Sequence, residues 1–292
     1  MKKKIIIGII VVLAVIGIYN FIQMKYTYNY FNVDLDTDIR YKKQLIKDAE
    51  KENKKHNEHK KNIEYVQKKP ENVNIPILMY HSISNINPIN KLLMPVDKFE
   101  EQIKWLKEND FTPMLMKDVV GAFKTGKVPK RPVALTFDDG YFDNYTDAYR
   151  ILEKYDMKGT FFVITNYVNQ DGMYMNLNML KEMKAHGMDI QSHTSDHKRL
   201  NWRGREAQTK AINDAKIYLK EKLGIDNKYL CYPVGRYTKT TLEVTKSAGM
   251  EAAVTTKNGI ANIDNGILSL DRVRMEPMSL DDFKKIFQEY LR

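Results

Sequence analysis

Short apolar runs alternate with amphipathic stretches from Asn74 onwards, and this alternation limits the possible folds more than any other feature of the sequence. The apolar runs cover residues 75–80, 133–137, 159–164, 188–191, 228–232, 251–255 and 268–275. Helical patterns lie between most of them, at residues 96–110, 143–155, 178–186, 203–222 and 239–248, and one more follows the last run, at residues 279–291. Strands that alternate with helices predict an α/β fold with a mainly parallel sheet and right-handed crossovers. Seven or eight such units over residues 74–292 favour a closed (β/α)7-8 barrel over an open sheet.

The helix predicted over residues 96–110 shows how the individual elements are assigned. Phe99, Ile103 and Leu106 recur at helical spacing and therefore share one face. Asp97 and Glu100 resemble a capping box near the start of this helix.

Residues 1–24 differ from the rest of the chain, because an uncharged run over residues 5–22 follows Lys2, Lys3 and Lys4. Eighteen residues at about 1.5 Å each can just cross a hydrocarbon core of about 30 Å. A cleaved signal peptide would have a shorter apolar run followed by a small-residue cleavage site, whereas Met24 and Tyr26 follow here. We therefore expect residues 1–24 to be an uncleaved signal anchor, a single transmembrane helix, with a removed signal peptide as the alternative. The three lysines favour a cytoplasmic N-terminus, which would place the remaining chain outside the cell membrane.

Residues 25–73 form a charged spacer in this interpretation. Residues 1–69 hold 15 Lys/Arg against 8 Asp/Glu, so +7 of the net charge of +10 lies outside the predicted barrel. A basic chain often binds nucleic acid, but this uneven distribution argues against that class of partner. The spacer could instead contact anionic polymers of a cell wall. His56 and His59 lie in this polar segment and are interpreted as surface residues. The single cysteine, Cys231, excludes a disulfide framework.

Chemically active side chains follow several of the predicted strands. In a barrel of parallel strands, the carboxyl ends of all strands open onto one shared mouth. The residues at these ends are His81, Asp138, Asp139, His193 with His197 four residues later, the Tyr232–Gly235 segment, and Arg272. Three of the four histidines outside the spacer therefore lie at strand ends.

The adjacent carboxylates Asp138 and Asp139 need an explanation, because two neighbouring negative charges repel each other. Asp-Gly is common turn chemistry, and a His-x-x-x-His pair alone is weak evidence for a metal. Together, however, two imidazoles and one carboxylate form a ligand set suited to Zn²⁺ or a similar divalent ion. One acid of the pair can bind such an ion while the other stays free as a base, and the cation offsets the repulsion.

The segments Thr136-Phe137-Asp138-Asp139-Gly140, Ser192–His197 and Tyr232–Gly235 resemble motifs of the polysaccharide deacetylases, carbohydrate esterase family 4. The resemblance covers roughly residues 74–292. It implies a distorted (β/α) barrel that removes acetyl groups from N-acetylglucosamine-type polymers with the help of a divalent ion, Zn²⁺ or alternatively Co²⁺ or Ni²⁺. It also implies that Asp138 is the general base and that Asp139, His193 and His197 bind the metal.

Two positions depart from the family pattern. Cys231 stands where the family usually has an arginine, and Arg272 stands where it usually has the histidine that acts as general acid. An arginine cannot readily donate a proton at neutral pH. His81, which ends the run Ile77–Tyr80, resembles the permuted arrangement of the poly-β-1,6-N-acetylglucosamine deacetylases. We therefore expect His81 to be the acid and Arg272 to hold Asp138 ionised and oriented, with a packed strand-end histidine and a surface ion pair as the plainer alternatives.

The remaining site predictions concern the substrate. The backbone N–H of Val234 is a candidate donor to the oxyanion, and Tyr141, Tyr232, Pro233 and Gly235 are candidates for the groove wall. Cys231 is interpreted as a small apolar filler. Three alternatives remain open at this level: a peptidoglycan N-acetylglucosamine deacetylase, a non-catalytic wall-carbohydrate-binding protein, and an anchored protein that acts through its basic spacer.

Overall fold

The computed structural model describes residues 63–87, 90–170 and 172–292. The described residues belong to one compact unit, Ile63–Arg292. The predicted anchor at residues 1–24 and the spacer up to residue 62 lie outside the described residues. In the three described ranges, no helix combines the length and the hydropathy needed to cross a membrane.

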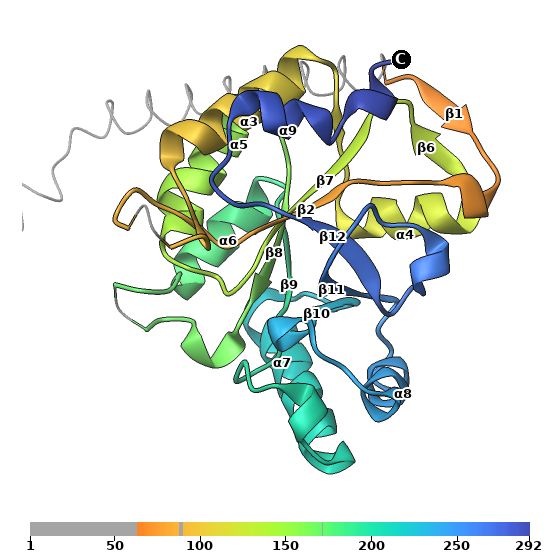
Figure 1. Ribbon diagram of the computed structural model, residues 1–292. Coiled ribbons are helices and arrows are strands. Elements are labelled where there is room, and N and C mark those ends of the chain that lie inside the picture. Colours follow the sequence, from red (N-terminus) through yellow and green to blue (C-terminus); the bar gives the residue numbers. More distant parts are fainter. Residues whose placement is uncertain (1–62, 88–89, 171) are drawn as a thin grey trace, which may run out of the picture. The chain divides into compact units, whose positions relative to one another are not determined.

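Within these ranges, seven parallel strands close into a barrel, as the alternation of strands and helices predicted. Their order is β2-β12-β11-β10-β9-β8-β7, and pairing of β2 with β7 closes the ring. A short strand, β5, is added outside β7. The ring strands are β2 (Ile77–Tyr80), β7 (Pro132–Phe137), β8 (Thr160–Val163), β9 (Asp189–Ser192), β10 (Tyr229–Cys231), β11 (Ala252–Asn258) and β12 (Leu270–Arg274). Figure 1 shows these strands at the centre, with helices around them.

The helices agree with the predicted pattern in most places. They are α3 (Val96–Glu108), α4 (Met116–Thr125), α5 (Arg150–Lys154), α6 (Leu177–Ala185), α7 (Arg205–Leu223), α8 (Lys239–Ser247) and α9 (Leu280–Lys285). The shorter helical turns are η1 (Pro70–Asn72), η2 (Asn144–Tyr149), η3 (Thr165–Tyr167), η4 (Leu200–Trp202), η5 (Pro233–Gly235), η6 (Ile263–Asn265) and η7 (Gln288–Tyr290). The helix α4 was not among the sequence predictions, and η2 is a π-helix within the segment predicted as an ordinary helix.

The start of α3 differs from the prediction. Its N-cap is Pro95, which makes no side-chain capping bond, so the capping box expected from Asp97 and Glu100 is absent. The amide of Val96 instead donates to Oδ1 of Asn85, at 3.0 Å. A side chain from an earlier loop therefore satisfies an amide at the helix start.

Residues 63–73, which the sequence placed in the spacer, are part of the compact unit. The strand β1 (Tyr65–Gln67) pairs antiparallel with β6 (Lys127–Pro129), just before β7 begins. Val73 is fully buried in a cluster that also holds residues of α4. Burial of this apolar surface explains why the ordered chain starts before Asn74. The remaining pair of short strands is β3 (Ser82–Ile83) with β4 (Leu93–Met94), while β5 spans Thr112–Pro113.

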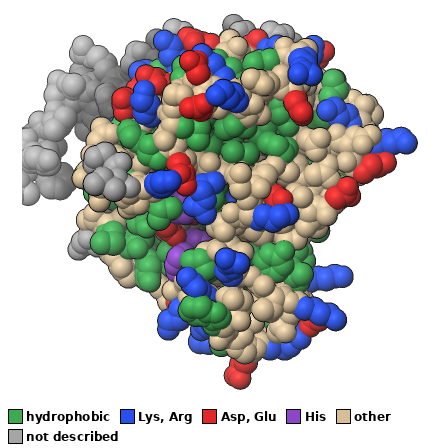
Figure 2. All heavy atoms as spheres, in the orientation of Figure 1, with side chains coloured by type: hydrophobic (Ala, Val, Ile, Leu, Met, Phe, Trp, Pro, Cys, Tyr) green, Lys and Arg blue, Asp and Glu red, His purple; other side chains and the backbone are tan. Residues whose placement is uncertain are grey.

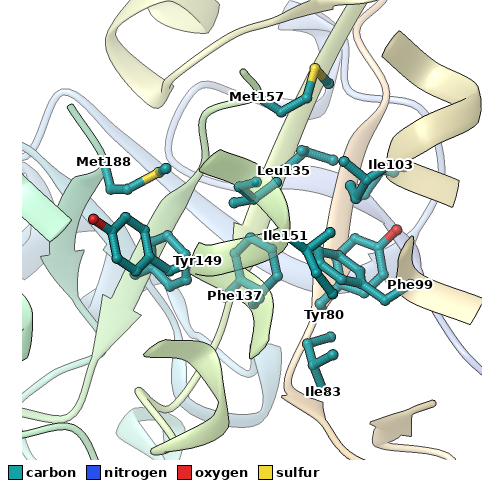
Figure 3. Packing of buried hydrophobic residues seen from close by; sticks show 14 of the residues in the cluster. Tyr80, Ile83, Phe99, Ile103, Leu135, Phe137, Tyr149, Ile151, Met157 and Met188 are labelled. Atoms are coloured by element: carbon teal, nitrogen blue, oxygen red, sulfur yellow. The ribbon is translucent and has the colours of Figure 1, made fainter. Parts of the chain in front are cut away.

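Aromatic packing fixes the two strand ends that carry the first site residues. Tyr80 and Phe137, the last residues of β2 and β7, stack with ring centroids 5.4 Å apart, and Phe99 of α3 packs edge-on against both. Figure 3 shows these rings together in the cluster of buried side chains. Because successive side chains of a strand point to opposite faces, His81 and Asp138 are directed away from this cluster.

Candidate active site

A left-handed turn separates the two adjacent carboxylates. Asp139 has φ 72° and Gly140 has φ 80°, and a Cβ on Gly140 would lie 3.0 Å from Cγ1 of Val163. The amide of Asp138 donates to the carbonyl of Tyr80 at 2.9 Å, which ties the turn to β2. The turn directs Asp138 toward Arg272 and Asp139 toward the histidines, so the two neighbours face different partners.

Asp139, His193 and His197 converge on one point, as the sequence predicted for the metal ligands. Oδ1 of Asp139 lies 3.4 Å from Nε2 of His193 and 3.3 Å from Nε2 of His197. Ligands at about 2.1 Å from a tetrahedral ion are about 3.4 Å apart, so these separations match such an ion. Oδ1 of Asp139 is also buried without a hydrogen-bond partner among the described residues. The three side chains therefore fit a divalent cation.

The surroundings of the two histidines suit metal binding. Nδ1 of His193 donates to the carbonyl of Cys231 at 2.8 Å, which leaves the lone pair of Nε2 free to face the cation. Burial and the neighbouring His193 lower the pKa of His197 to about 4, so this ring is neutral at pH 7. Thr194 and His197 both adopt the left-handed region, with φ 68° and 54°. Backbone strain of this kind is concentrated at functional sites.

The guanidinium of Arg272 binds the free carboxylate. Nη1 and Nη2 donate to Oδ1 and Oδ2 of Asp138, at 2.8 and 2.7 Å, and both side chains are buried. Nε donates to the carbonyl of Thr255 and Nη1 also to Oγ1 of Thr136, which orient the guanidinium. Burial alone would raise the pKa of Asp138, but the charge and hydrogen bonds of Arg272 hold it well below its usual range. The predicted contact between Arg272 and Asp138 is therefore present, and the surface ion pair considered as an alternative is excluded.

His81 lies on the other side of Asp138. Its Nε2 is 3.9 Å from Oδ2 of Asp138, and 14% of its side chain is exposed, so the ring still reaches the solvent. Burial lowers the pKa of His81, although Asp138 and Asp139 act in the opposite direction. The imidazole is thus placed at the mouth beside the carboxylate rather than packed within the core.

Cys231 fills the space beside this pair. Its side chain is fully buried, with Sγ 3.4 Å from Oδ2 of Asp138 and 3.3 Å from Nη2 of Arg272. Burial raises the pKa of the thiol, which keeps it protonated. The residue behaves as a small filler, and Arg272 reaches Asp138 from β12 past the cysteine.

The η5 loop follows β10 at the carboxyl end of that strand. Val234 adopts φ 52°, a strained conformation for a β-branched residue, and is 37% exposed. Gly235 follows with φ 68°, and a Cβ there would lie 2.1 Å from Oγ1 of Thr256. The loop is therefore held tightly against β11 while Val234 stays accessible.

The predictions for the groove wall are only partly supported. Tyr141 is partly buried, stacks on Tyr174 with centroids 5.4 Å apart, and has its pKa raised by burial and by Asp139. Tyr232 and Pro233, in contrast, are buried and cannot line a groove. The hydroxyl of Tyr232 donates to the carbonyl of Leu268 at 2.9 Å, so this ring belongs to the core next to α8. The prediction for Tyr232 and Pro233 was wrong, because the structure buries both side chains.

The site opens at the surface, as expected for the carboxyl ends of the strands. In Figure 2, histidine and acidic side chains appear together in a hollow that is flanked by Lys and Arg side chains. Thr136, which holds the guanidinium of Arg272 and donates to the carbonyl of Leu78, was not predicted. A threonine inside an apolar strand carries no sequence signal of such a role beyond its polarity.

Comparisons with known proteins agree with this geometry. Residues 125–253 match the family model described as polysaccharide deacetylase. The YxkH protein of Bacillus subtilis (strain 168), named as a polysaccharide deacetylase, is 39% identical over 204 residues, which cover 70% of this chain and 72% of that protein. The poly-β-1,6-N-acetyl-D-glucosamine N-deacetylase of Staphylococcus aureus (strain MRSA252) is 31% identical, over 60% of this chain and 69% of that enzyme. The solved Streptococcus pyogenes deacetylase PplD, in complex with acetate, is 37% identical with a TM-score of 0.72, over 74% of this chain and 99% of that one. The chain belongs to the polysaccharide deacetylase family.

Proposed function

We propose that this enzyme hydrolyses the N-acetyl groups of N-acetylglucosamine residues in an extracellular polysaccharide, and that it depends on a divalent metal ion. One observation carries the proposal: the ligand set Asp139, His193 and His197 lies beside an ionised carboxylate, Asp138, and an imidazole, His81. A bound divalent ion, with Zn²⁺ as our candidate and Co²⁺ or Ni²⁺ as alternatives, would polarise the acetyl carbonyl and acidify water at this point.

The residues of the chain then have separate tasks. Asp138 accepts a proton from the water that attacks the acetyl carbon, and Arg272 keeps this carboxylate ionised and aimed. The N–H of Val234 is the candidate donor to the carbonyl oxygen as negative charge develops on it. His81 donates a proton to the sugar nitrogen while the C–N bond breaks. The products are acetate and a free amine.

We propose poly-β-1,6-N-acetylglucosamine as the polymer. The similarity to the Staphylococcus aureus enzyme of that name supports this choice. The position of His81 at the end of the first barrel strand, with Arg272 in the last, resembles the permuted arrangement expected for that subgroup. Peptidoglycan presents the same acetamide, so substrate shape rather than the metal site distinguishes the two polymers.

The substrate proposal is tested by measuring acetate released from acetylated β-1,6-glucosamine oligomers and from peptidoglycan glycan strands, with the full chain and its Asp138→Asn variant. Release from the β-1,6 oligomers alone supports the proposal. Acetate release from glycan strands alone would identify peptidoglycan as the substrate and leave the proposed deacetylation chemistry unchanged. Release from neither, with saturating Zn²⁺ and ligand binding intact, would favour a non-catalytic carbohydrate-binding protein.

For the N-terminal part we propose that residues 1–24 anchor the enzyme in the cell membrane as a single span, with the catalytic unit outside. The uncharged run over residues 5–22 and the lysines before it support this placement. The basic spacer is proposed to contact anionic wall polymer. Deleting residues 38–62 should weaken binding to wall polymer while acetate release stays unchanged, and equal binding of the deletion variant would exclude that contact.

A further inference from the structure

The chain segment after Asp138, the proposed base, is hydrogen-bonded to the segment that carries His81, the proposed acid. His81 lies between β2 and β3. This residue and the two after it form hydrogen bonds with the side chains of Asp143 and Asn144. Nδ2 of Asn144 donates to the carbonyl of His81 at 2.7 Å. Oδ2 of Asp143 accepts from the hydroxyl of Ser82 at 2.5 Å, and its Oδ1 accepts from the amide of Ile83 at 3.1 Å.

We propose that Asn144 and Asp143 are positioning residues that set the place of the His81 imidazole relative to Asp138. This inference rests on the proposed role of His81 as general acid. The two residues form one unit, because Nδ2 of Asn144 also donates to Oδ1 of Asp143 at 3.0 Å. Together with the bond from the amide of Asp138 to the carbonyl of Tyr80, they hold the backbone on both sides of His81. We call Asp143 and Asn144 the clamp.

The composition of this clamp is unfavourable for the stability of the fold. Asn144 is fully buried, and its Oδ1 has no hydrogen-bond partner among the described residues, which is a destabilising arrangement. Asp143 is a partly buried carboxylate whose hydrogen bonds come from the uncharged donors Ser82, Ile83 and Asn144, and burial raises its pKa. Groups that cost stability are retained where they hold something else in place.

The local backbone supports the same role. Asn144 is the first residue of η2, a six-residue π-helix that leads into α5. Such widened turns are rare and occur frequently at functional sites. The amide of Asn144 donates to the carbonyl of Tyr141, so the clamp is connected within a few residues to Asp139 and Asp138. Asp138, Asp139, Asp143 and Asn144 therefore belong to one short continuous segment, residues 138–144.

A double-mutant cycle tests the inference with the full chain and a β-1,6-linked N-acetylglucosamine oligomer as the probe. Asn144→Ala should lower kcat roughly 10- to 100-fold, because a displacement of about 1 Å in a catalytic group can cost this much. KM should change little, since the clamp does not line the groove. In the His81→Ala background the same substitution should lower kcat less than about twofold, because there is no acid left to misplace.

Asn227→Ala is the matched control. Asn227 is an equally buried amide whose Nδ2 donates to the carbonyl of Tyr229 at 2.9 Å, but it stands before the start of β10, away from the mouth. Any effect of Asn227→Ala on kcat should be the same with and without His81. If Asn144→Ala gives no folded protein, Ser82→Ala removes only one hydroxyl of the clamp and should show the same dependence on His81 with a smaller loss.

The outcomes separate the inference from the function on which it rests. A large loss in His81→Ala, together with an effect of Asn144→Ala that vanishes in that background, supports the clamp. If His81→Ala is impaired but Asn144→Ala lowers kcat by the same factor in both backgrounds, the clamp is merely structural and the inference fails. If His81→Ala keeps full activity, the acid role itself is wrong.

Discussion

Arg272 and Asp138 form a bidentate ion pair that is closed off from solvent, with N–O distances of 2.8 and 2.7 Å. The pair joins β12 to β7 across β2, so it also fastens the closure of the barrel. Its functional consequence is electrostatic. Burial raises the pKa of a carboxyl group and the neighbouring guanidinium lowers it, and only the ionised carboxylate can accept a proton from water.

Substitution of Arg272 should therefore change the pH dependence of the reaction. The guanidinium depresses the pKa of Asp138 and so favours the ionised carboxylate. In Arg272→Met this pKa rises, and activity should be lost as the pH falls through the new, higher value. Loss of one partner of a buried pair should also lower the free energy of unfolding by about 3–5 kcal/mol. The pH profile of kcat/KM for acetate release, with a melting curve for each variant, measures both effects.

Lys257→Met provides the control for Arg272. Lys257 pairs with Asp271, the neighbour of Arg272 on β12, but its side chain is 73% exposed. Its removal should leave the acid limb of the profile in place. An Arg272→Met enzyme that folds and keeps the wild-type acid limb would show that Arg272 does not govern the ionisation of the base.

Substitution of His81 should distinguish leaving groups. An amine must be protonated as it departs, whereas the nitrophenolate of 4-nitrophenyl acetate leaves without a proton. His81→Ala should therefore lose roughly 10²–10⁴-fold in rate on the acetamide but much less on the ester. His186→Ala, which changes an exposed histidine paired with Glu153, should leave both rates unchanged. Equal losses of His81→Ala on the two substrates would argue against an acid role.

The η5 loop offers a prediction about the oxyanion donor. In Gly235→Ala the new Cβ would collide with Thr256, at 2.1 Å from Oγ1 and 2.4 Å from the backbone N, so the loop must move. The displaced N–H of Val234 should then cost roughly 10²–10³-fold in kcat, the usual effect of losing one such donor. Gly249→Ala has the same sign of φ, +76°, but an added Cβ there meets only Nζ of Lys216 at 3.6 Å. Gly249→Ala should lower the free energy of unfolding by about 1 kcal/mol and leave kcat normal. A normal kcat for folded Gly235→Ala would exclude the donor role of the η5 loop.

The sequence was informative where the chemistry follows from strand order. Parallel strands bring their carboxyl ends to one mouth, so the sequence alone predicts that His81, Asp138, Asp139, His193 and Arg272 lie together. The alternation of apolar runs also predicted the barrel. These features depend on period and topology, which a single sequence displays directly.

Other features depend on tertiary context that one sequence does not reveal. The hydroxyl of Tyr232 donates to the carbonyl of Leu268, 36 residues later, and this contact holds the ring in the interior. No local sequence pattern predicts it. The capping box at Asp97 failed because Asn85 supplies the partner for the helix start. Asn144 and Asp143 gave no signal at all, since their partners around His81 lie about sixty residues earlier in the chain.

Removal of the metal should abolish acetate release reversibly. Because the binding energy of the ion adds to the stability of the folded state, chelation should lower the Tm as well as abolish acetate release. Addition of Zn²⁺, Co²⁺ or Ni²⁺ should restore both quantities, and the ion that restores most activity at stoichiometric concentration identifies the best fit to the site. Full activity after exhaustive chelation would remove the metal from the reaction.

The adjacent acids permit the most direct test of the central claim, that Asp139 with His193 and His197 holds a divalent ion while Asp138 stays free. The measurement is the metal content per chain, by elemental mass spectrometry, of the wild type, Asp138→Asn and Asp139→Asn after loading with Zn²⁺ and desalting. We predict about one ion per chain in the wild type and in the inactive Asp138→Asn, and a nearly empty site in Asp139→Asn. Equal metal content in both variants, or loss of the ion from Asp138→Asn alone, would contradict the account.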